Sequence, residues 1–305
     1  MKTRKLADYL FITLKGLAMG AADVVPGVSG GTIAFISGIY EELINSINSI
    51  NLSIFSLWKK QGFKAVWKQI NGNFLASLIL GILISIFSLA KVLSWLLENE
   101  PILLWAFFFG LVLASVFFVG KEIPKWNLGT VSVFVLGAAL AYLVTELPAS
   151  ENSGSLPYLF MSGMLAICAM ILPGISGAFI LVLLGSYKTI LDAVHQRDLI
   201  IVFTVGLGCV VGLLSFARVL KWMFNNYRVP TLALLTGFIL GSLNKIWPWK
   251  EVLQTKDFGD RTMIIAERNI WPWAFQGDNQ LLLAVILAIL GFCLIFILER
   301  AASKK

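Results

Sequence analysis

The chain has 305 residues, of which 58% are hydrophobic and 13% are charged, and its net charge is +7. Soluble domains have about a quarter charged residues, so this composition excludes a soluble globular protein and indicates a membrane protein with several spans. The basic residues flank apolar segments and do not line one surface, so we expect no nucleic-acid partner. The three cysteines lie inside apolar runs, and we therefore expect no disulfide framework, metal or cofactor.

Six apolar segments are long enough to cross a bilayer, three in each half of the chain. They are 73–97, 101–121, 128–147, 199–222, 231–248 and 280–298. Two shorter apolar segments, 6–20 and 157–170, each end just before a Pro-Gly motif. As helices they reach about 22 Å, which is short of a hydrocarbon core of about 30 Å. We expect each to be the first arm of a helical hairpin, 6–50 or 157–194.

The two halves of the chain are repeats of one another. Residues 26–30 read Pro-Gly-Val-Ser-Gly and residues 173–177 read Pro-Gly-Ile-Ser-Gly. The matching pairs outside this motif are Gly16 and Gly163, Gly38 and Gly185, Tyr40 and Tyr187, Gly81 and Gly208, Lys91 and Arg218, and Gly110 and Gly237. An odd number of crossings per copy inverts the second copy relative to the first. The sequence therefore predicts an all-α polytopic membrane protein with two inverted repeats, 1–150 and 151–305, each a re-entrant helical hairpin plus three transmembrane helices.

Loop charges set the expected orientation. If the first hairpin returns to its own side, the N-terminus and the four lysines of 51–72 share a face with the basic residues of 121–127 and of the C-terminus. A broken helix that crosses would put those four lysines outside, which the positive-inside rule disfavours. We therefore expect both termini in the cytoplasm, with Arg197 as an exception on the outer side. The segment 249–279 is expected to be an outer interfacial loop or a short amphipathic helix.

The two Pro-Gly motifs are the candidate site. Each is expected to end one helix and to start another, because proline lacks a backbone donor and glycine permits sharp turns. A helix start offers unpaired N–H groups at the positive end of the dipole, which favours phosphate and other anions. The predicted phosphate ligands are Gly27, Ser29, Gly30, Gly31, Thr32, Gly174, Ser176 and Gly177. The alternative is that these small residues only let helices pack closely; two copies in segments too short to span favour binding.

Charge balance points to further residues. Two helix starts supply about +1, whereas a phosphate monoester carries about −1.5 to −2. Lys91 and Arg218 are the candidates for the missing charge, since basic residues inside a membrane are costly; the alternative is that both extend to the lipid headgroups. Asp23 precedes the first motif, and Met170 stands at its position in the second copy. We expect Asp23 either to carry a coupling proton or to cap the helix break.

The run from Gly20 to Thr32, together with Gly38-Ile39-Tyr40-Glu41 and Leu172-Pro173-Gly174-Ile175-Ser176-Gly177, resembles the PopT-like polyprenyl-phosphate transporter family over essentially the whole chain. The resemblance implies a multi-pass protein of the bacterial plasma (inner) membrane. It implies that the protein returns undecaprenyl phosphate, the lipid carrier of cell-wall synthesis, from the outer to the cytoplasmic leaflet.

The residues by themselves indicate an anion site but no lipid tail. They leave open an ion-coupled transporter or channel for a small soluble anion. An intramembrane enzyme is disfavoured, because no cluster of histidine, cysteine or carboxylate side chains accompanies either motif. The oligomeric state is also open, a homo-oligomer included.

Overall fold

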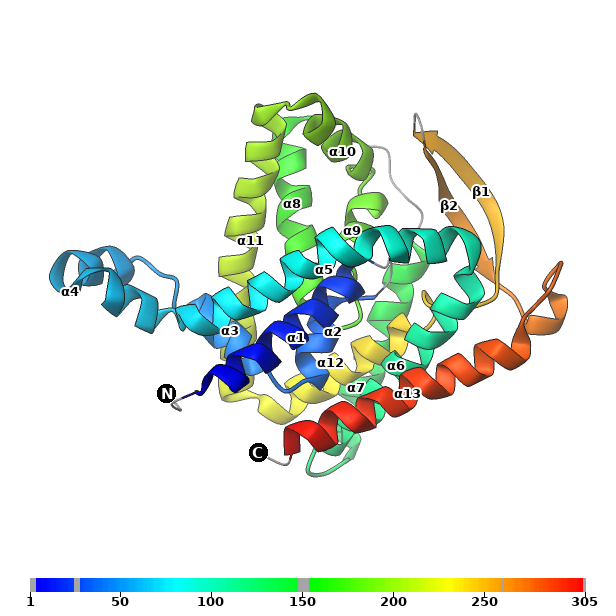
Figure 1. Cartoon of the computed structure of the whole chain (residues 1–305), viewed down its shortest axis with the longest axis horizontal. Coiled ribbons are helices and arrows are strands. Elements are labelled where there is room, and N and C mark those ends of the chain that lie inside the picture. Colours follow the sequence, from blue (N-terminus) through cyan, green and yellow to red (C-terminus); the bar gives the residue numbers. More distant parts are fainter. Residues whose placement is uncertain (1–3, 25–27, 148–153, 259–260, 304–305) are drawn as a thin grey trace.

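The computed structural model describes residues 4–24, 28–147, 154–258 and 261–303 (Figure 1). The described part of the first half of the chain is helical. The two motif-bearing regions each contain three helices: α1 (Leu6–Val24), α2 (Gly30–Ile36) and α3 (Tyr40–Asn48), and then α8 (Leu156–Ile171), α9 (Gly177–Leu183) and α10 (Tyr187–Gln196). The remaining helices of the first half are α4 (Ser53–Gln69), α5 (Gly72–Asn99), α6 (Pro101–Lys121) and α7 (Leu128–Glu146). The second half continues with α11 (Leu199–Asn226), α12 (Arg228–Ser242), β1 (Lys250–Phe258), β2 (Arg261–Asn269), the short 3-10 helix η1 (Pro272–Ala274) and α13 (Leu281–Ser303).

Four helices of the described chain are long and apolar enough to cross a membrane, namely α5, α6, α7 and α11. The pair α9 and α10 adds a fifth candidate, a broken span or a re-entrant loop bent by 111°. The chain is therefore a mostly helical polytopic membrane protein. The predicted span 231–248 is shorter than expected, since α12 ends at Ser242. Pro248 disfavours helical geometry at the residue before it, which fits the turn that replaces the last part of this span.

The second arm of each predicted hairpin is divided into two short helices. The break between α2 and α3 contains Gly38 with φ of +71°, and the break between α9 and α10 contains Gly185 with φ of +62°. Glycine adopts positive φ without the steric cost that a side chain adds. These two glycines are equivalent in the sequence repeat, so the same residue type makes the same local turn in both halves.

Glycines allow the longer helices to approach closely. Gly81 of α5 faces the Thr13 carbonyl of α1, and Gly208 of α11 faces the Phe160 carbonyl of α8. A methyl group at either glycine would overlap the carbonyl opposite. Equivalent glycines therefore join α1 to α5 in the first half and α8 to α11 in the second, as small residues do at membrane helix interfaces. The same kind of contact joins α6 to α13 and α7 to α12.

Replacing Gly110 by alanine should destabilise the protein by about 1–3 kcal/mol, the usual cost of overpacking a core. The added methyl group would overlap the Ala288 carbonyl and force α6 away from α13. Gly206→Ala on α11 is the matched control, since no atom lies within 4 Å of the position that its methyl group would take. Thermal unfolding of the purified variants measures the difference, and equal stability of the two would contradict the close α6–α13 contact.

Polar contacts show which helix ends lie on the same side of the molecule. Arg4 donates to Glu42 of α3 through both terminal nitrogens at 2.6 Å, and Arg228 at the start of α12 pairs with Glu41 at 2.9 Å. At the other end, Gln280 Nε2 donates to Glu100 Oε2 at 3.1 Å. The N-terminus, α3 and the start of α12 therefore share one side, and the α5–α6 turn shares the other side with the start of α13. Figure 1 shows both chain ends in the lower part of the view, away from the strands.

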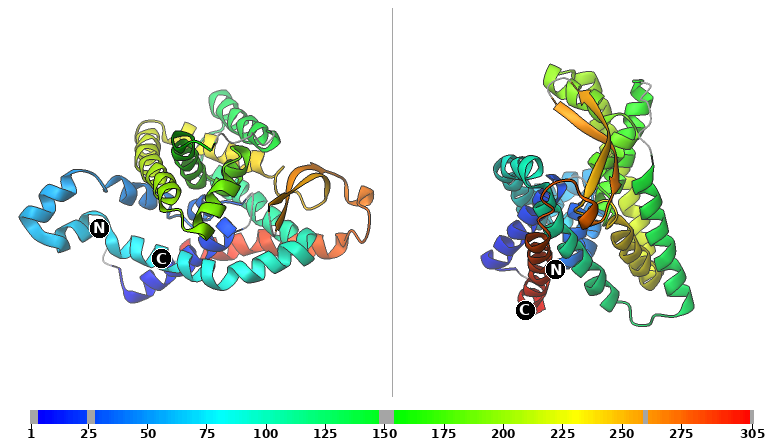
Figure 2. Two further views of the ribbon diagram at one scale, coloured as in Figure 1. Left: turned by 90° about the horizontal axis from the view of Figure 1, so that it is seen from above. Right: turned by 90° about the vertical axis from the view of Figure 1, so that its right-hand side faces the viewer.

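The segment 249–279 is mostly a β-hairpin, so the expectation of a loop or a short amphipathic helix was wrong. Strands β1 and β2 pair antiparallel from Lys250 opposite Asn269 to Phe258 opposite Arg261. Both runs contain β-branched residues, which suit a strand, and in the sequence Gly259-Asp260 separates them, a pair typical of two-residue hairpin connections. Figures 1 and 2 show the two strands running side by side along their length.

The segment 51–72, which was expected to be a loop, contains the helix α4. None of its residues is buried, and Gly62 with φ of +76° interrupts it. The four lysines of this segment lie on this helix, which extends away from the rest of the molecule in Figure 1.

Candidate functional site

The two Pro-Gly motifs meet in space. The backbone N–H of Gly174 donates to Thr32 Oγ1 at 2.8 Å, across 142 residues of sequence. The Ser29 hydroxyl lies 3.1 Å from the carbonyl oxygens of Met170 and of Leu172, and it can donate to either. Ser29 and Thr32 are each only 1% exposed. The start of α2 and the end of α8 therefore form one buried contact, which we call the tip junction (Ser29–Thr32 with Met170–Gly174).

The helix start at the first motif already has acceptors within the protein. Gly30 N donates to Asp23 Oδ1 at 2.7 Å, and Gly31 N donates to Ser29 Oγ at 3.0 Å. Ser29 is thus the N-cap of α2, and Asp23 is a second acceptor at the same helix start. Gly27 lies outside the described residues. In this conformation, the N–H groups that were predicted to bind phosphate are held by a carboxylate and a hydroxyl.

Close packing alone accounts for three glycines of the two motifs. A Cβ atom at Gly31 would overlap the Ile171 carbonyl, and one at Gly177 would lie 2.6 Å from the Ala166 carbonyl. Gly174 has φ of +89°, and its Cβ atom would lie 2.7 Å from the Phe238 carbonyl of α12. These three glycines therefore allow the helices to pack closely, as the alternative interpretation of the motifs expects, whether or not the tip junction also binds a ligand.

The second motif differs from the first in its charged neighbour. Ser176 caps α9 by accepting from Phe179 N at 3.5 Å, and Met170 occupies the position equivalent to Asp23. The ammonium of Lys245, just beyond α12, lies 4.8 Å from the centre of the Phe179 ring. Sequence reasoning missed this cation, because Lys245 fell inside a segment assigned to a membrane span.

Neither of the two predicted cations has a described contact with the tip junction. Arg218 is exposed on α11, and no hydrogen bond or ion pair among the described residues joins it to the tip junction. Lys91 lies on α5, and its side chain is outside the described part of the structure. Lys245 is therefore the basic side chain that the described structure brings to the second motif.

Lys245 belongs to a partly buried ion-pair cluster with the β-hairpin. Lys245 Nζ and Lys250 Nζ each lie 2.8 Å from Glu267 Oε1. Burial opposes ionisation of Glu267, but Lys250 and Lys245 outweigh it and hold the pKa of this carboxyl below its usual value of 4.5. Because its pKa is lowered in the folded state, the Glu267 carboxylate contributes stability at neutral pH, and this contribution is lost as the pH falls through the lowered pKa.

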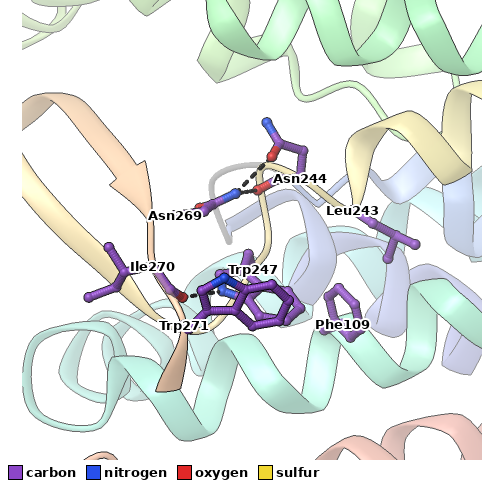
Figure 3. Close-up of a pocket in the computed structure, with 7 residues that line it drawn as sticks. All are labelled: Phe109, Leu243, Asn244, Trp247, Asn269, Ile270 and Trp271. Atoms are coloured by element: carbon purple, nitrogen blue, oxygen red, sulfur yellow. Dashed lines mark hydrogen bonds between the residues drawn. The ribbon is translucent and has the colours of Figure 1, made fainter. Parts of the chain in front are cut away.

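Two adjoining cavities lie beside this cluster. One has a volume of about 440 Å³, and its walls include Trp247, Trp271 and Phe109 (Figure 3). The other has a volume of about 370 Å³, and its walls include Lys245 and Glu267. Asn244 and Asn269 line both cavities, so an aromatic space and a charged space share a wall.

Residues 19–262 match a family model named VCA0040-like and described as undecaprenyl phosphate translocase-like. The chain belongs to this family. A polyprenyl-phosphate transporter of Vibrio cholerae serotype O1 is 47% identical to it over 308 residues, which cover 98% of this chain and 99% of the relative. A polyprenyl-phosphate transporter of Staphylococcus aureus is 33% identical over 254 residues, which cover 77% and 85%. No solved structure matches the chain.

The resemblance read from the two Pro-Gly motifs is thus confirmed. The part of the chain matched by the undecaprenyl phosphate translocase-like family includes both motifs and the whole of α12 with the lysine beyond it. The tip junction and the cation beside it are therefore both within the region that defines the family.

Proposed function

We propose that this protein moves polyprenyl phosphate, undecaprenyl phosphate in the first place, from the outer to the cytoplasmic leaflet of the bacterial plasma membrane. The observation that carries the proposal is the tip junction, a buried contact between the two motifs beside which the Asp23 carboxylate accepts from the Gly30 N–H group. The proposal is also supported by the family of the chain, because two relatives are named polyprenyl-phosphate transporters. The lipid passes through unchanged, so the protein acts as a transporter and not as an enzyme.

Phosphate binding at the junction proceeds by exchange of anions. Asp23 Oδ1 accepts from Gly30 N, and no ion pair within the described residues includes Asp23. A helix start offers only about half a positive charge, which does not suffice for a carboxylate and a phosphate together. The phosphate therefore displaces Asp23 and takes the donors of the two motifs, from Gly27, Ser29, Gly30, Gly31, Thr32, Gly174, Ser176 and Gly177. A displaced Asp23 takes up a proton, which couples transport to protons.

The two halves form inverted repeats in this proposal, and the motifs approach each other from opposite faces. Support comes from the equivalent turns at Gly38 and Gly185 and from the matched pairs α1–α5 and α8–α11. Lys91 and Arg218 attract the phosphate as the lipid approaches along the outer surfaces of α5 and α11. Alternation of the two sides then exposes the same junction to each leaflet in turn.

The proposed orientation puts both termini and α4 in the cytoplasm and the β-hairpin outside. A cysteine at Lys59 on α4 should react with a membrane-impermeant maleimide only after cells are permeabilised, whereas one at Asp278 should react in intact cells. Cys168, Cys209 and Cys293 are replaced first, so that the labelling reports only the new thiol. Labelling of the Lys59 site in intact cells would reverse the orientation.

The activity is tested in proteoliposomes that contain polyprenyl phosphate with a fluorescent group beside the phosphate. The protein should speed the loss of outer-leaflet probe, as measured with an impermeant quencher, relative to empty liposomes. Uptake of radioactive inorganic phosphate by the same vesicles tests the alternative of a small soluble anion. Faster uptake of inorganic phosphate without lipid movement would replace the proposal by that alternative, and release of phosphate from the lipid would indicate an enzyme.

A further inference from the structure

We infer that the space between the β-hairpin and the end of α12 is a second binding site, which takes a prenyl phosphate before the lipid reaches the tip junction. Lys245 binds its phosphate, and the aromatic cavity takes the first part of its chain. This site rests on the proposed function, because it supplies the same substrate. It differs from the tip junction in place and in residues.

The charged part of the site contains two lysines for one carboxylate. Lys250 is fully engaged, since it also donates to the Lys245 carbonyl at 2.7 Å and lies 4.6 Å from the centre of the Trp105 ring. Among the described residues, the Lys245 ammonium has polar contacts only with Glu267 and the Phe179 ring, and its side chain is 23% exposed. Lys245 is therefore the ammonium that can change its partner, while Lys250 keeps Glu267 in place.

A phosphate can bind at this site only by replacing a carboxylate, because the neighbouring charged side chains already have partners. Glu146 lines the same cavity and accepts from Asn244 Nδ2 at 2.6 Å, and Arg268 pairs with Glu251 at 2.6 Å. No large uncompensated positive charge is thus available in the described cavity. A phosphate binds by replacing Glu267 at Lys245, and its greater negative charge favours the exchange.

The apolar part of the site lies directly beside the charged part. Asn269 Nδ2 donates to both the backbone and side-chain oxygens of Asn244 at 2.8 Å, and these two residues form the shared wall (Figure 3). Trp247, whose indole N–H is bound to the Ile270 carbonyl at 2.9 Å, and Trp271 present their rings to the other side of that wall. A charged cavity joined to an aromatic one fits a molecule with a phosphate at one end and an unsaturated hydrocarbon chain at the other.

The same lysine connects this site to the junction. Phe179, over whose ring Lys245 lies, belongs to the first turn of α9, and its N–H is bound to Ser176 of the second motif. The Phe179 side chain would therefore separate a phosphate on Lys245 from the second motif. Release from Lys245 delivers it towards Gly174 and Ser176.

Binding of farnesyl phosphate to the purified full-length protein tests the site, with farnesol and inorganic phosphate as probes of each half. Wild type should bind farnesyl phosphate more tightly than either. Lys245→Gln should weaken that binding at least about tenfold, as expected for loss of a charged hydrogen bond. Lys245→Arg should retain most of it, and Lys64→Gln on α4 should have no effect. Glu267→Gln, which keeps the acceptor but removes the competing charge, should tighten it.

A purely structural ion pair gives a different result, since Lys245→Gln and Glu267→Gln would then weaken binding equally and lower the melting temperature together. That outcome, or equal affinity for inorganic phosphate, would overturn the site. A photoreactive prenyl phosphate should label residues 244–247 or 267–271 in wild type. Labelling confined to the tip junction would overturn this site and leave the proposed function standing. If added undecaprenyl phosphate reduces the labelling of no residue, the result would contradict both this site and the proposed function.

Discussion

Gly31→Val should reduce transport of polyprenyl phosphate about 5- to 150-fold, which corresponds to about 1–3 kcal/mol. The added side chain would overlap the Ile171 carbonyl and separate the start of α2 from the end of α8. It would therefore disturb the contact that brings Ser29 and Thr32 to the second motif. The leaflet assay in proteoliposomes measures the loss, with protein insertion quantified in the same vesicles.

Gly206→Val on α11 is the matched control, because no atom lies within 4 Å of the position that its Cβ atom would take. It should transport at nearly the wild-type rate. If Gly31→Val inserts, folds and also transports at the wild-type rate, the tip junction is a packing contact and does not take part in translocation.

Asp23→Asn should remove most of the dependence of transport on an imposed pH gradient. In the proposed mechanism, phosphate displaces an ionised Asp23 from Gly30, and the displaced carboxylate takes up a proton. External acid should therefore accelerate inward movement. Asparagine can still accept the Gly30 N–H bond that the structure shows at 2.7 Å, but it neither competes as an anion nor carries a proton. Prenyl phosphate binding should become tighter in this variant while its response to pH is lost.

Two results would separate the alternatives for Asp23. Full pH dependence in Asp23→Asn would make the phosphate itself the proton carrier, since its second pKa lies near 6. Transport that ignores the pH gradient in the wild type would eliminate proton coupling altogether. Asp23→Ala is the companion variant, because it also removes the acceptor and leaves Gly30 N without its partner.

Periodicity and chain punctuation predicted most of the helical elements, although α4 was expected to be a loop and α12 is shorter than its predicted span. Long apolar runs identified α5, α6, α7 and α11, and Pro-Gly pairs identified the breaks after α1 and α8. These features are local, because a helix in the membrane forms its backbone hydrogen bonds within itself and needs no distant segment of the chain for them. The left-handed turns at Gly38 and Gly185 were present in the repeat as matched glycines, although their consequence, a divided second arm, was not predicted.

The partners across the chain could not be predicted in the same way. Asp23 was assigned either to a proton or to a cap, and the structure places it on Gly30 N, where one residue can serve both purposes. Lys245 was not considered, because it fell inside a predicted membrane span and its partner Glu267 lies on β2, a strand that was not predicted. The strands themselves were not predicted, although β-branched residues on both sides of Gly259-Asp260 were the available signal.

The most direct test of the central claim is an experimental structure of the protein with polyprenyl phosphate bound. The phosphate should lie on the backbone N–H groups of the tip junction, with Asp23 displaced from the Gly30 N–H group that it now occupies. A bound phosphate that lies away from both motifs, with the Asp23–Gly30 and Thr32–Gly174 hydrogen bonds intact in every conformation obtained, would contradict the account.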